Sequence, residues 1–179
     1  VDGVFYADPR IVKEAKKINE INYEEMLELS SLGARVLHTR SVQLALQYNV
    51  NLQVLSSFTG KKGTMLTKKN AVLEKQIIRG IAHSNNETLI TLIGIKNKPG
   101  ISAIIFNALS KENINVDMIV QSGSAEDANV TYAFTISKND TAKSKSIMHK
   151  LKTKIKFTDL FINNKICKVS IVGLGMKTN

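Results

Sequence analysis

The clearest alternation of apolar and polar segments lies between residues 88 and 121. Thr88–Ile95 is a largely apolar run, and Lys98-Pro99-Gly100 follows it as an interruption. From Gly100 to Glu112 the apolar residues return at helical spacing, and another apolar run covers Val116–Ser122. The pattern predicts a strand, a Pro-Gly turn, a helix and a second strand, which brings a helix N-terminus close to strand ends.

The alternation continues with two more strands and a second helix. The expected elements are an acidic loop at Gly123–Asn129, a strand at Val130–Ile136, a helix at Asp140–Thr153 with Asp140 as N-cap, and a strand at Lys156–Ile162. Counted from Thr88, the order is β-α-β-β-α-β. This order predicts an α+β, ferredoxin-like module over residues 71–163, in which two helices cover one face of an antiparallel sheet.

A further strand is predicted on each side of this module. Gln76–His83 precedes it, and Ser84-Asn85-Asn86 has the composition of a hairpin turn. Lys168–Gly173 follows it and runs into glycine, as the first strand of the module does. We therefore expect residues 164–179 to be the first strand of a second, truncated copy.

The first 70 residues predict a separate unit with a linker at its end. Asn22 followed by Glu25 has the pattern of a capping box that opens a helix, and Gly33 ends that helix. The expected elements are a turn-rich loop at Val1–Arg10, a polar connection at Ile11–Ile21, helices at Tyr23–Leu29 and Ala34–Tyr48, a strand at Leu52–Ser56 and a linker at Phe58–Asn70. The glycines of the linker place a domain boundary near residue 70.

The composition is that of a globular protein. With 179 residues, 43% of them hydrophobic, the chain can bury the core of one large or two small domains. Its most apolar run, Ile101–Leu109, is too short to span a bilayer, and the N-terminal residues show no basic and then apolar leader pattern. We therefore expect a cytoplasmic protein without a membrane partner.

The formal charge of +10 would suit a nucleic-acid partner if the cations were clustered. They are scattered instead, only four of the 25 are arginine, and no aromatic stacking strip accompanies them. Lys68-Lys69 and the lysines of Lys143–Lys156 fit solvated surface better. We expect no nucleic-acid partner, and steep salt-dependent binding to a duplex or a single strand would contradict this.

The remaining reactive side chains do not form a catalytic or metal-binding pattern. Cys167 is the single cysteine, which excludes a disulfide and a zinc site of ordinary Cys/His spacing, and we expect it to pack in its apolar segment. His38 and His149 have no nucleophile or carboxylate at relay spacing, so packing or exposure is the expected role. We expect no catalytic residue and no metal site.

The Pro-Gly turn has chemistry that suits a free amino acid. Pro99 fits the first turn of a helix, and Gly100 lets a ligand approach the backbone closely. The N–H groups of Gly100, Ile101 and Ser102 would face an α-carboxylate at the positive end of the helix dipole. An ammonium group would need oxygen atoms nearby, and the candidates are Asn97, Asn115, Asp117 and Gln121. Taken by itself, such a turn more often only connects a strand to a helix and binds no ligand.

Two runs around this turn resemble a known family. The run from Ile93 to Gly100 and the run Asn115–Gln121 are similar to the "D-K-P-G" and "N-I-D-M-(I/V)-x-Q" segments of the first ACT domain of aspartokinases. In that family these positions bind lysine or threonine at an interface between ACT domains. The resemblance implies an effector site at Asn97, Lys98, Pro99, Gly100, Ile101, Ser102, Asn115, Asp117 and Gln121. Asn97 stands where the family usually has aspartate.

The N-terminal residues resemble the same family. Val1–Arg10 is similar to a nucleotide-site loop late in the aspartokinase catalytic domain, and Tyr23–Leu29 with Gly33–Val42 is similar to "Y-x-E-M-x-E-L…G-A-K-V-L-H-P-R-S-V". The resemblance implies nucleotide contacts at Phe5, Arg10, Arg35 and Val36. Phe5 and Arg35 replace the more usual tyrosine and lysine, and Thr39 replaces a proline. Surface arginines paired with Asp8 or Glu28 are the alternative for Arg10 and Arg35.

The resemblance implies the C-terminal part of an aspartokinase: an α/β remnant of the amino-acid-kinase domain at 1–70, an ACT domain at 71–163 and a truncated second ACT domain at 164–179. The parent would phosphorylate aspartate with ATP and Mg²⁺. This chain lacks the family's N-terminal "K-F-G-G-T-S" loop, so we expect no cofactor in it and no activity on its own.

The expected partners are an amino-acid effector, lysine or threonine, and a second copy of the chain through ACT domains. The alternative is a free-standing amino-acid sensor that associates with a separate catalytic aspartokinase chain.

Overall fold

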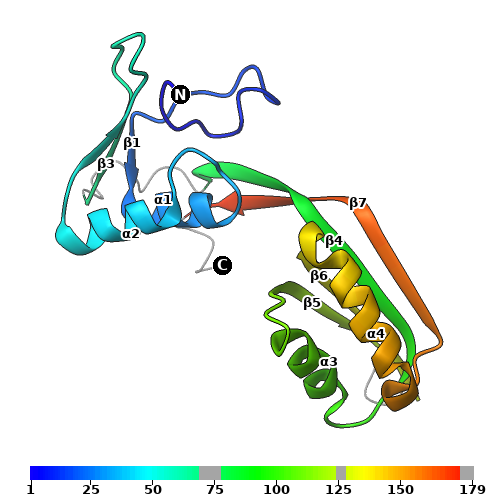
Figure 1. Ribbon diagram of the computed structural model, residues 1–179. Helices are drawn as coiled ribbons and strands as arrows, with labels where there is room; N and C mark the ends of the chain where they lie inside the picture. Colours follow the sequence, from blue (N-terminus) through cyan, green and yellow to red (C-terminus); the bar gives the residue numbers. More distant parts are fainter. Residues whose placement is uncertain (69–77, 124–127, 174–179) are drawn as a thin grey trace. The chain divides into compact units, whose positions relative to one another are not determined.

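The computed structural model describes residues 1–68, 78–123 and 128–173. Contacts divide the chain into two compact units, one of residues 1–84 with 169–179 and one of residues 85–168. The predicted α+β class is confirmed, with a three-stranded and a four-stranded sheet among the described residues (Figure 1). The boundary predicted near residue 70 falls within residues 69–77, which lie outside the described ranges.

The first unit combines a short mixed sheet with two helices. Strand β3 lies between β1, which is parallel to it, and β2, which is antiparallel. The elements are β1 at Glu20–Asn22, α1 at Tyr23–Ser31, α2 at Thr39–Tyr48, β2 at Leu52–Val54 and β3 at Thr64–Thr67. The two helices pack against each other, and Tyr23, Met26 and Leu29 of α1 are buried with Val42 of α2.

The predicted capping box at the start of α1 is confirmed. The Asn22 side chain accepts a hydrogen bond from the Glu25 N–H at 2.7 Å, and the Glu25 carboxylate accepts one from the Asn22 N–H at 3.3 Å. Two backbone donors that a helix start leaves unpaired are thereby satisfied.

Three predictions for the first unit were wrong in their bounds. The second helix begins at Thr39 and not at Ala34, because the His38 side chain accepts the Arg40 N–H as an N-cap. The predicted polar connection ends in β1 and the predicted linker contains β3. These strands have only three and four residues, which is too short for a recognisable alternation of apolar and polar residues. They are stabilised by pairing with each other.

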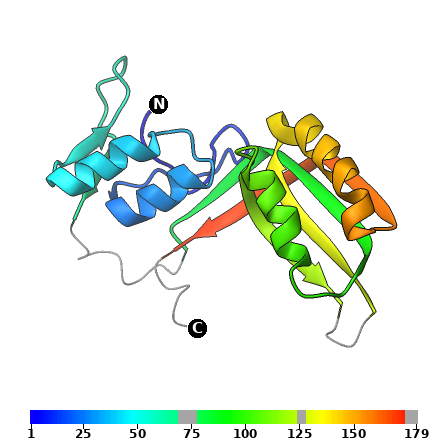
Figure 2. The ribbon, with the colours of Figure 1, turned by 60° about the horizontal axis from the view of Figure 1, so that its bottom comes forward.

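The second unit contains the predicted βαββαβ arrangement. The sheet order is β5-β6-β4-β7, and β6 is antiparallel to both β5 and β4. The elements are β4 at Gly80–Lys96, α3 at Ile101–Ser110, β5 at Val116–Ser122, β6 at Asn129–Ser137, the short helix η2 at Lys138–Asp140, α4 at Thr141–Ile155 and β7 at Asp159–Val172. Helices α3 and α4 cover the same face of the sheet (Figure 2). The ferredoxin-like fold is therefore confirmed.

Two predicted breaks between strands do not exist. The predicted turn at Ser84-Asn85-Asn86 lies inside β4, and the strand predicted at Lys168–Gly173 is the end of β7. A hairpin would need the two arms of β4 to pair with each other. They have other partners instead, because Glu87–Leu92 pairs with β6 and the Ile81 N–H bonds the Tyr6 carbonyl at 2.7 Å.

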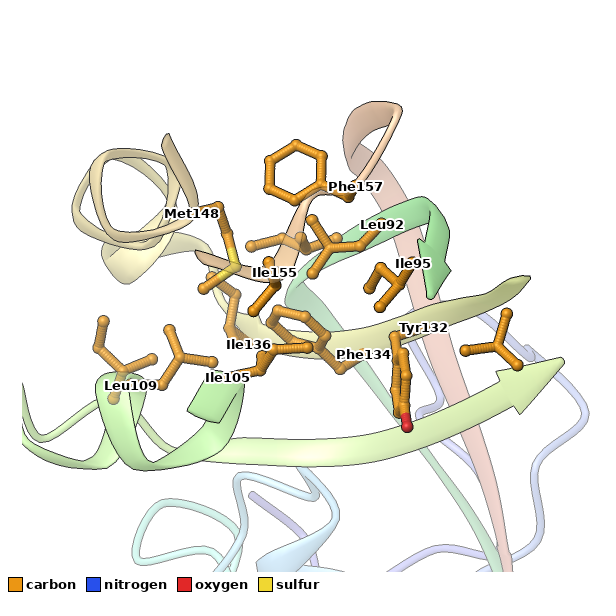
Figure 3. Packing of buried hydrophobic residues seen from close by; sticks show 13 residues of the cluster. Leu92, Ile95, Ile105, Leu109, Tyr132, Phe134, Ile136, Met148, Ile155 and Phe157 are labelled. Carbon is orange, nitrogen blue, oxygen red and sulfur yellow. The ribbon is translucent and has the colours of Figure 1, made fainter. Parts of the chain in front are cut away.

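The core of the second unit lies between the sheet and the two helices. Ile105 and Leu109 of α3 and Met148 of α4 point toward Phe134 of β6 (Figure 3). The rings of Phe106 and Phe134 meet edge to face, with centroids 5.6 Å apart. This packing fixes α3, and therefore its N-terminus, against the sheet.

Two details of the second unit differ from expectation. Asp140 precedes α4 but its side chain makes no capping hydrogen bond, because η2 has already begun at Lys138. Cys167, which we expected to pack, is exposed on β7. Strand β7 lies at the edge of the sheet. Although its sequence alternates between apolar and polar residues, no described element packs over Cys167. Among the described residues, no helix has both the length and the apolar character needed to cross a membrane.

The packing of Phe134 leads to a stability prediction. Phe134→Ala removes a fully buried ring and its partner contact with Phe106, so we expect the free energy of unfolding to fall by about 3–5 kcal/mol. Phe161→Ala is the matched control, because Phe161 is 57% exposed, and it should change the free energy little. Denaturant unfolding followed by circular dichroism measures both, and equal losses in the two variants would contradict the assigned core.

Candidate effector and nucleotide sites

The start of α3 is the best-formed candidate for binding an amino acid. Gly100 is the N-cap residue, with φ of 87°, and it has no side chain with which to cap the helix. We had predicted Pro99 in the first turn of the helix, and this was wrong: Pro99 precedes the N-cap residue and lies outside the helix. The Ile101 N–H makes only a long 3.5 Å bond to the Lys98 carbonyl, and the first turn of a helix leaves its N–H groups without intrahelical partners. These donors suit a carboxylate.

Tyr132 is a neighbour of this site that the sequence analysis missed. Its hydroxyl lies 2.8 Å from the Ser102 hydroxyl in the first turn of α3. Tyr132 is on β6, directly opposite Gln121 of β5, and the ring is nearly buried while its hydroxyl points away from the apolar cluster (Figure 3). The available signal was a tyrosine at a position of the Val130–Ile136 run that alternates with Thr131 and Ala133 and so shares a face with Phe134. The pair connects the start of α3 to β6, the strand that pairs with the one carrying Gln121.

Asp117 has a cation of its own within the chain. Its carboxylate accepts a hydrogen bond from Lys168 Nζ, which also lies 3.8 Å from the Glu87 carboxylate. The hydrogen bond to Asp117 raises the pKa of Lys168. Lys168 therefore neutralises the negative charge of Asp117. This carboxylate is less available to an effector's ammonium group than the sequence suggested.

The other predicted effector residues lie at the surface around the turn. Asn97 follows β4, and its N–H donates to the Ala128 carbonyl at 3.0 Å. Lys98 is exposed, as are Asn115 before β5 and Gln121 near its end. The structure thus connects Ser102, Tyr132 and Gln121 through one hydrogen bond and one strand register, whereas Asp117 is engaged by Lys168.

The predicted nucleotide residues occupy two segments of the first unit. Phe5 is half-buried and pairs through its backbone with Lys17. Arg35 is exposed and Val36 is half-buried against the core of the unit, in the segment between α1 and α2. Arg35 can therefore reach solvent, as a phosphate-binding arginine must.

Arg10 makes the ion pair that we considered as its alternative role. Its Nη2 lies 2.7 Å from one Asp8 carboxylate oxygen, and its Nε and backbone N–H bond the other oxygen at 3.0 and 2.9 Å. The hydrogen bonds from Arg10 lower the pKa of Asp8 to about 2. A phosphate group at Arg10 would have to share the guanidinium with Asp8.

Comparison with known proteins assigns both parts of the chain. Family models match at residues 90–151, as an ACT domain, and at residues 1–56, as the amino acid kinase family. The aspartate kinase of Pseudomonas putida is 41% identical over 180 residues, which is all of this chain and 44% of that protein. The regulatory subunit of aspartate kinase from Thermus thermophilus, in its ligand-free form, is 32% identical over 57% of this chain and 67% of that one, with a TM-score of 0.54.

This chain belongs to the aspartokinase family. E. coli aspartokinase III, solved in complex with lysine and aspartate, superposes with a TM-score of 0.72 at 28% identity, over 97% of this chain and 38% of that one. The chain spans 44% of the length of the P. putida relative. It is an aspartokinase regulatory region with an ACT domain.

The Asp8–Arg10 pair gives this aspartokinase region a measurable titration. The folded pKa of Asp8 is below its ordinary value of 3.8, so the contribution of the ionised pair to stability is complete above about pH 4 and is lost as the pH falls through about 2. We expect ¹³C NMR of the Asp8 carboxyl to titrate near pH 2. In Arg10→Met the midpoint should rise toward 3.8, and an unchanged midpoint would contradict the pair.

Proposed function

We propose that this chain is the feedback-sensing region of an aspartokinase, and that free lysine or threonine binds at the start of α3. The observation that carries the proposal is the Gly100 N-cap, which leaves the first-turn N–H groups of α3 without a side-chain acceptor. An α-carboxylate placed there would gain charge-assisted hydrogen bonds and a favourable interaction with the helix dipole. The lysine bound to E. coli aspartokinase III supports the choice of ligand.

The ammonium end of the effector would meet neutral acceptors. Asn97 supplies an amide where the family usually has a carboxylate, and Asp117 already faces Lys168. The Ser102 hydroxyl lies in the first turn of α3 and contacts the Tyr132 hydroxyl, and Gln121 is opposite Tyr132 in the strand register. We infer a site that recognises the carboxylate strongly and the ammonium weakly.

The whole enzyme would transfer the γ-phosphoryl group of ATP, with Mg²⁺, to the side chain of aspartate. Phe5, Arg10, Arg35 and Val36 would contribute to its nucleotide site, with Arg35 the more available of the two arginines because Arg10 is paired with Asp8. Effector binding would act by its different affinity for active and inhibited arrangements of the enzyme. The amino acid kinase match at residues 1–56 supports this role over that of a free-standing sensor.

The edge of the four-stranded sheet suits association with a second copy. Strand β5 is at one end of the sheet order, and every residue after Val116 in it is exposed, including Met118, Ile119 and Val120. An exposed apolar edge strand presents unpaired backbone groups that another strand can satisfy. We therefore propose a homo-oligomer that forms through β5.

Calorimetric titration tests the effector site. We expect both the chain and its Asn97→Asp variant to release or absorb heat with lysine or threonine, and the variant to bind about fivefold more tightly. The added carboxylate would face the effector's ammonium group across partly solvated space, where such pairs contribute about 1 kcal/mol.

Asn139→Asp is the matched control for this titration. It adds the same charge at an exposed residue just before α4, so it tests whether charge at a different helix start has the same effect. We expect it to leave the affinity unchanged. If neither lysine nor threonine produces heat with the chain or with Asn97→Asp, the effector proposal is wrong.

Light scattering tests the proposed association. We expect at least a dimer, and Val120→Lys should shift the mass toward the monomer because an edge-strand lysine opposes strand pairing. Phe161→Lys, on the exposed part of β7 at the other edge, is the control and should leave the mass unchanged. A monomeric mass for the unmodified chain at high concentration would refute the dimer.

A further inference from the structure

The first unit contains a buried ion pair that the sequence analysis did not assign. Arg79 Nε lies 3.1 Å from Glu25 Oε1, and the two side chains are only 7% and 1% exposed. The guanidinium also donates to the Glu20 carbonyl at 3.1 Å. The second oxygen of Glu25 accepts the Asn22 N–H in the capping box. One carboxylate therefore fixes both the start of α1 and the Arg79 side chain.

Arg79 immediately precedes β4, and the first residues of β4 contact both predicted nucleotide segments. The Ile81 N–H bonds the Tyr6 carbonyl at 2.7 Å, next to Phe5. The His83 carbonyl lies so close to Gly33 that a Cβ there would stand 2.7 Å from it, two residues before Arg35. The same short stretch of strand therefore contacts the loop that carries Phe5 and Arg10 and the segment that carries Arg35 and Val36.

The backbone contacts leave this part of β4 little freedom to shift. A Cβ at Gly80 would meet the Leu29 side chain of α1 at 2.8 Å, and the His83 carbonyl packs closely against Gly33. Close packing of this kind fixes distance, but it does not fix the position of a strand along its own axis. Directional bonds do so: the backbone N–H groups of Arg79 and Ile81 bond the Val172 and Tyr6 carbonyls, both at 2.7 Å. The Arg79 guanidinium adds bonds to Glu25 and to the Glu20 carbonyl, which tie this stretch to the start of α1.

We propose that Arg79 is a positioning residue for the nucleotide segments. Through Glu25 it holds the start of β4 in register against Tyr6 and Gly33, and so sets the separation of the Phe5 and Arg35 segments. Strand β4 continues to Lys96, next to Asn97 of the proposed effector site. The positioning role of Arg79 rests on the proposed function only in taking a nucleotide as the ligand of the Phe5 and Arg35 segments.

Hydrogen exchange of the 179-residue chain, followed by mass spectrometry, tests the assignment without any ligand. In Arg79→Met we expect exchange to rise about tenfold or more in peptides that cover residues 4–10 and 32–36, because an unpaired buried carboxylate disrupts its surroundings. Peptides within 90–95 of the second unit should exchange as in the unmodified chain. Arg79→Lys restores the cation but not the guanidinium's several directed bonds, so it should recover only part of the protection.

Lys143→Met is the matched control, because it removes a lysine from an exposed ion pair with Glu112. It should change exchange at neither nucleotide segment. If Arg79→Met does not fold, Glu25→Gln provides a milder loss of the same pair and should give a smaller increase in the same peptides.

Two results would overturn the assignment. One is unchanged exchange at residues 4–10 and 32–36 in the variants of this pair, and the other is an equal increase throughout the chain, which would show a purely structural role. Calorimetry with lysine and threonine on the same samples reports the effector site separately. If the unmodified chain binds neither lysine nor threonine, the proposed function is contradicted, and the exchange result is unaffected.

Discussion

Strand β4 is hydrogen-bonded to a neighbour on each side, β6 and β7, and this double pairing constrains most of the structure. Because a paired strand alternates its side chains between two faces, Ile90 and Leu92 point into the core beneath the helices. The register shifts between Leu92 and Ile95, where Gly94 has a φ of 72° and leaves no room for a Cβ beside Thr158. The end of β4 is thereby fixed, and with it the turn that opens α3.

Charge acts in two different ways in this chain. The net charge of +10 comes from scattered lysines, and the Lys143–Glu112 and Arg10–Asp8 pairs are formed at the surface, where water weakens each interaction. The Arg79–Glu25 pair is buried, so either charge without its partner would be strongly unfavourable. In the proposed effector site, the backbone donors at the start of α3 would matter more than any lysine, because their direction is set by the packed helix.

Much of the fold could be predicted because it depends on neighbouring residues. The capping box of Asn22 and Glu25, the helix after Gly100 and the order of the elements in the second unit follow from local spacing and turn chemistry. The same reasoning failed at Ser84-Asn85-Asn86, where a sequence with turn composition is held straight by strand pairing. It also missed β3, whose four residues depend on partners elsewhere in the chain.

The sequence by itself determined the family, the α+β class, and the Pro-Gly turn with its uncapped helix start, since each is written in a short run of residues. Only the tertiary structure decided which groups face one another. Tyr132 meets Ser102 across 30 residues, Lys168 meets Asp117 across 51, and Arg79 meets Glu25 across 54. No local pattern encodes such pairs, because they form only when packing of the sheets and helices brings distant segments within hydrogen-bond distance.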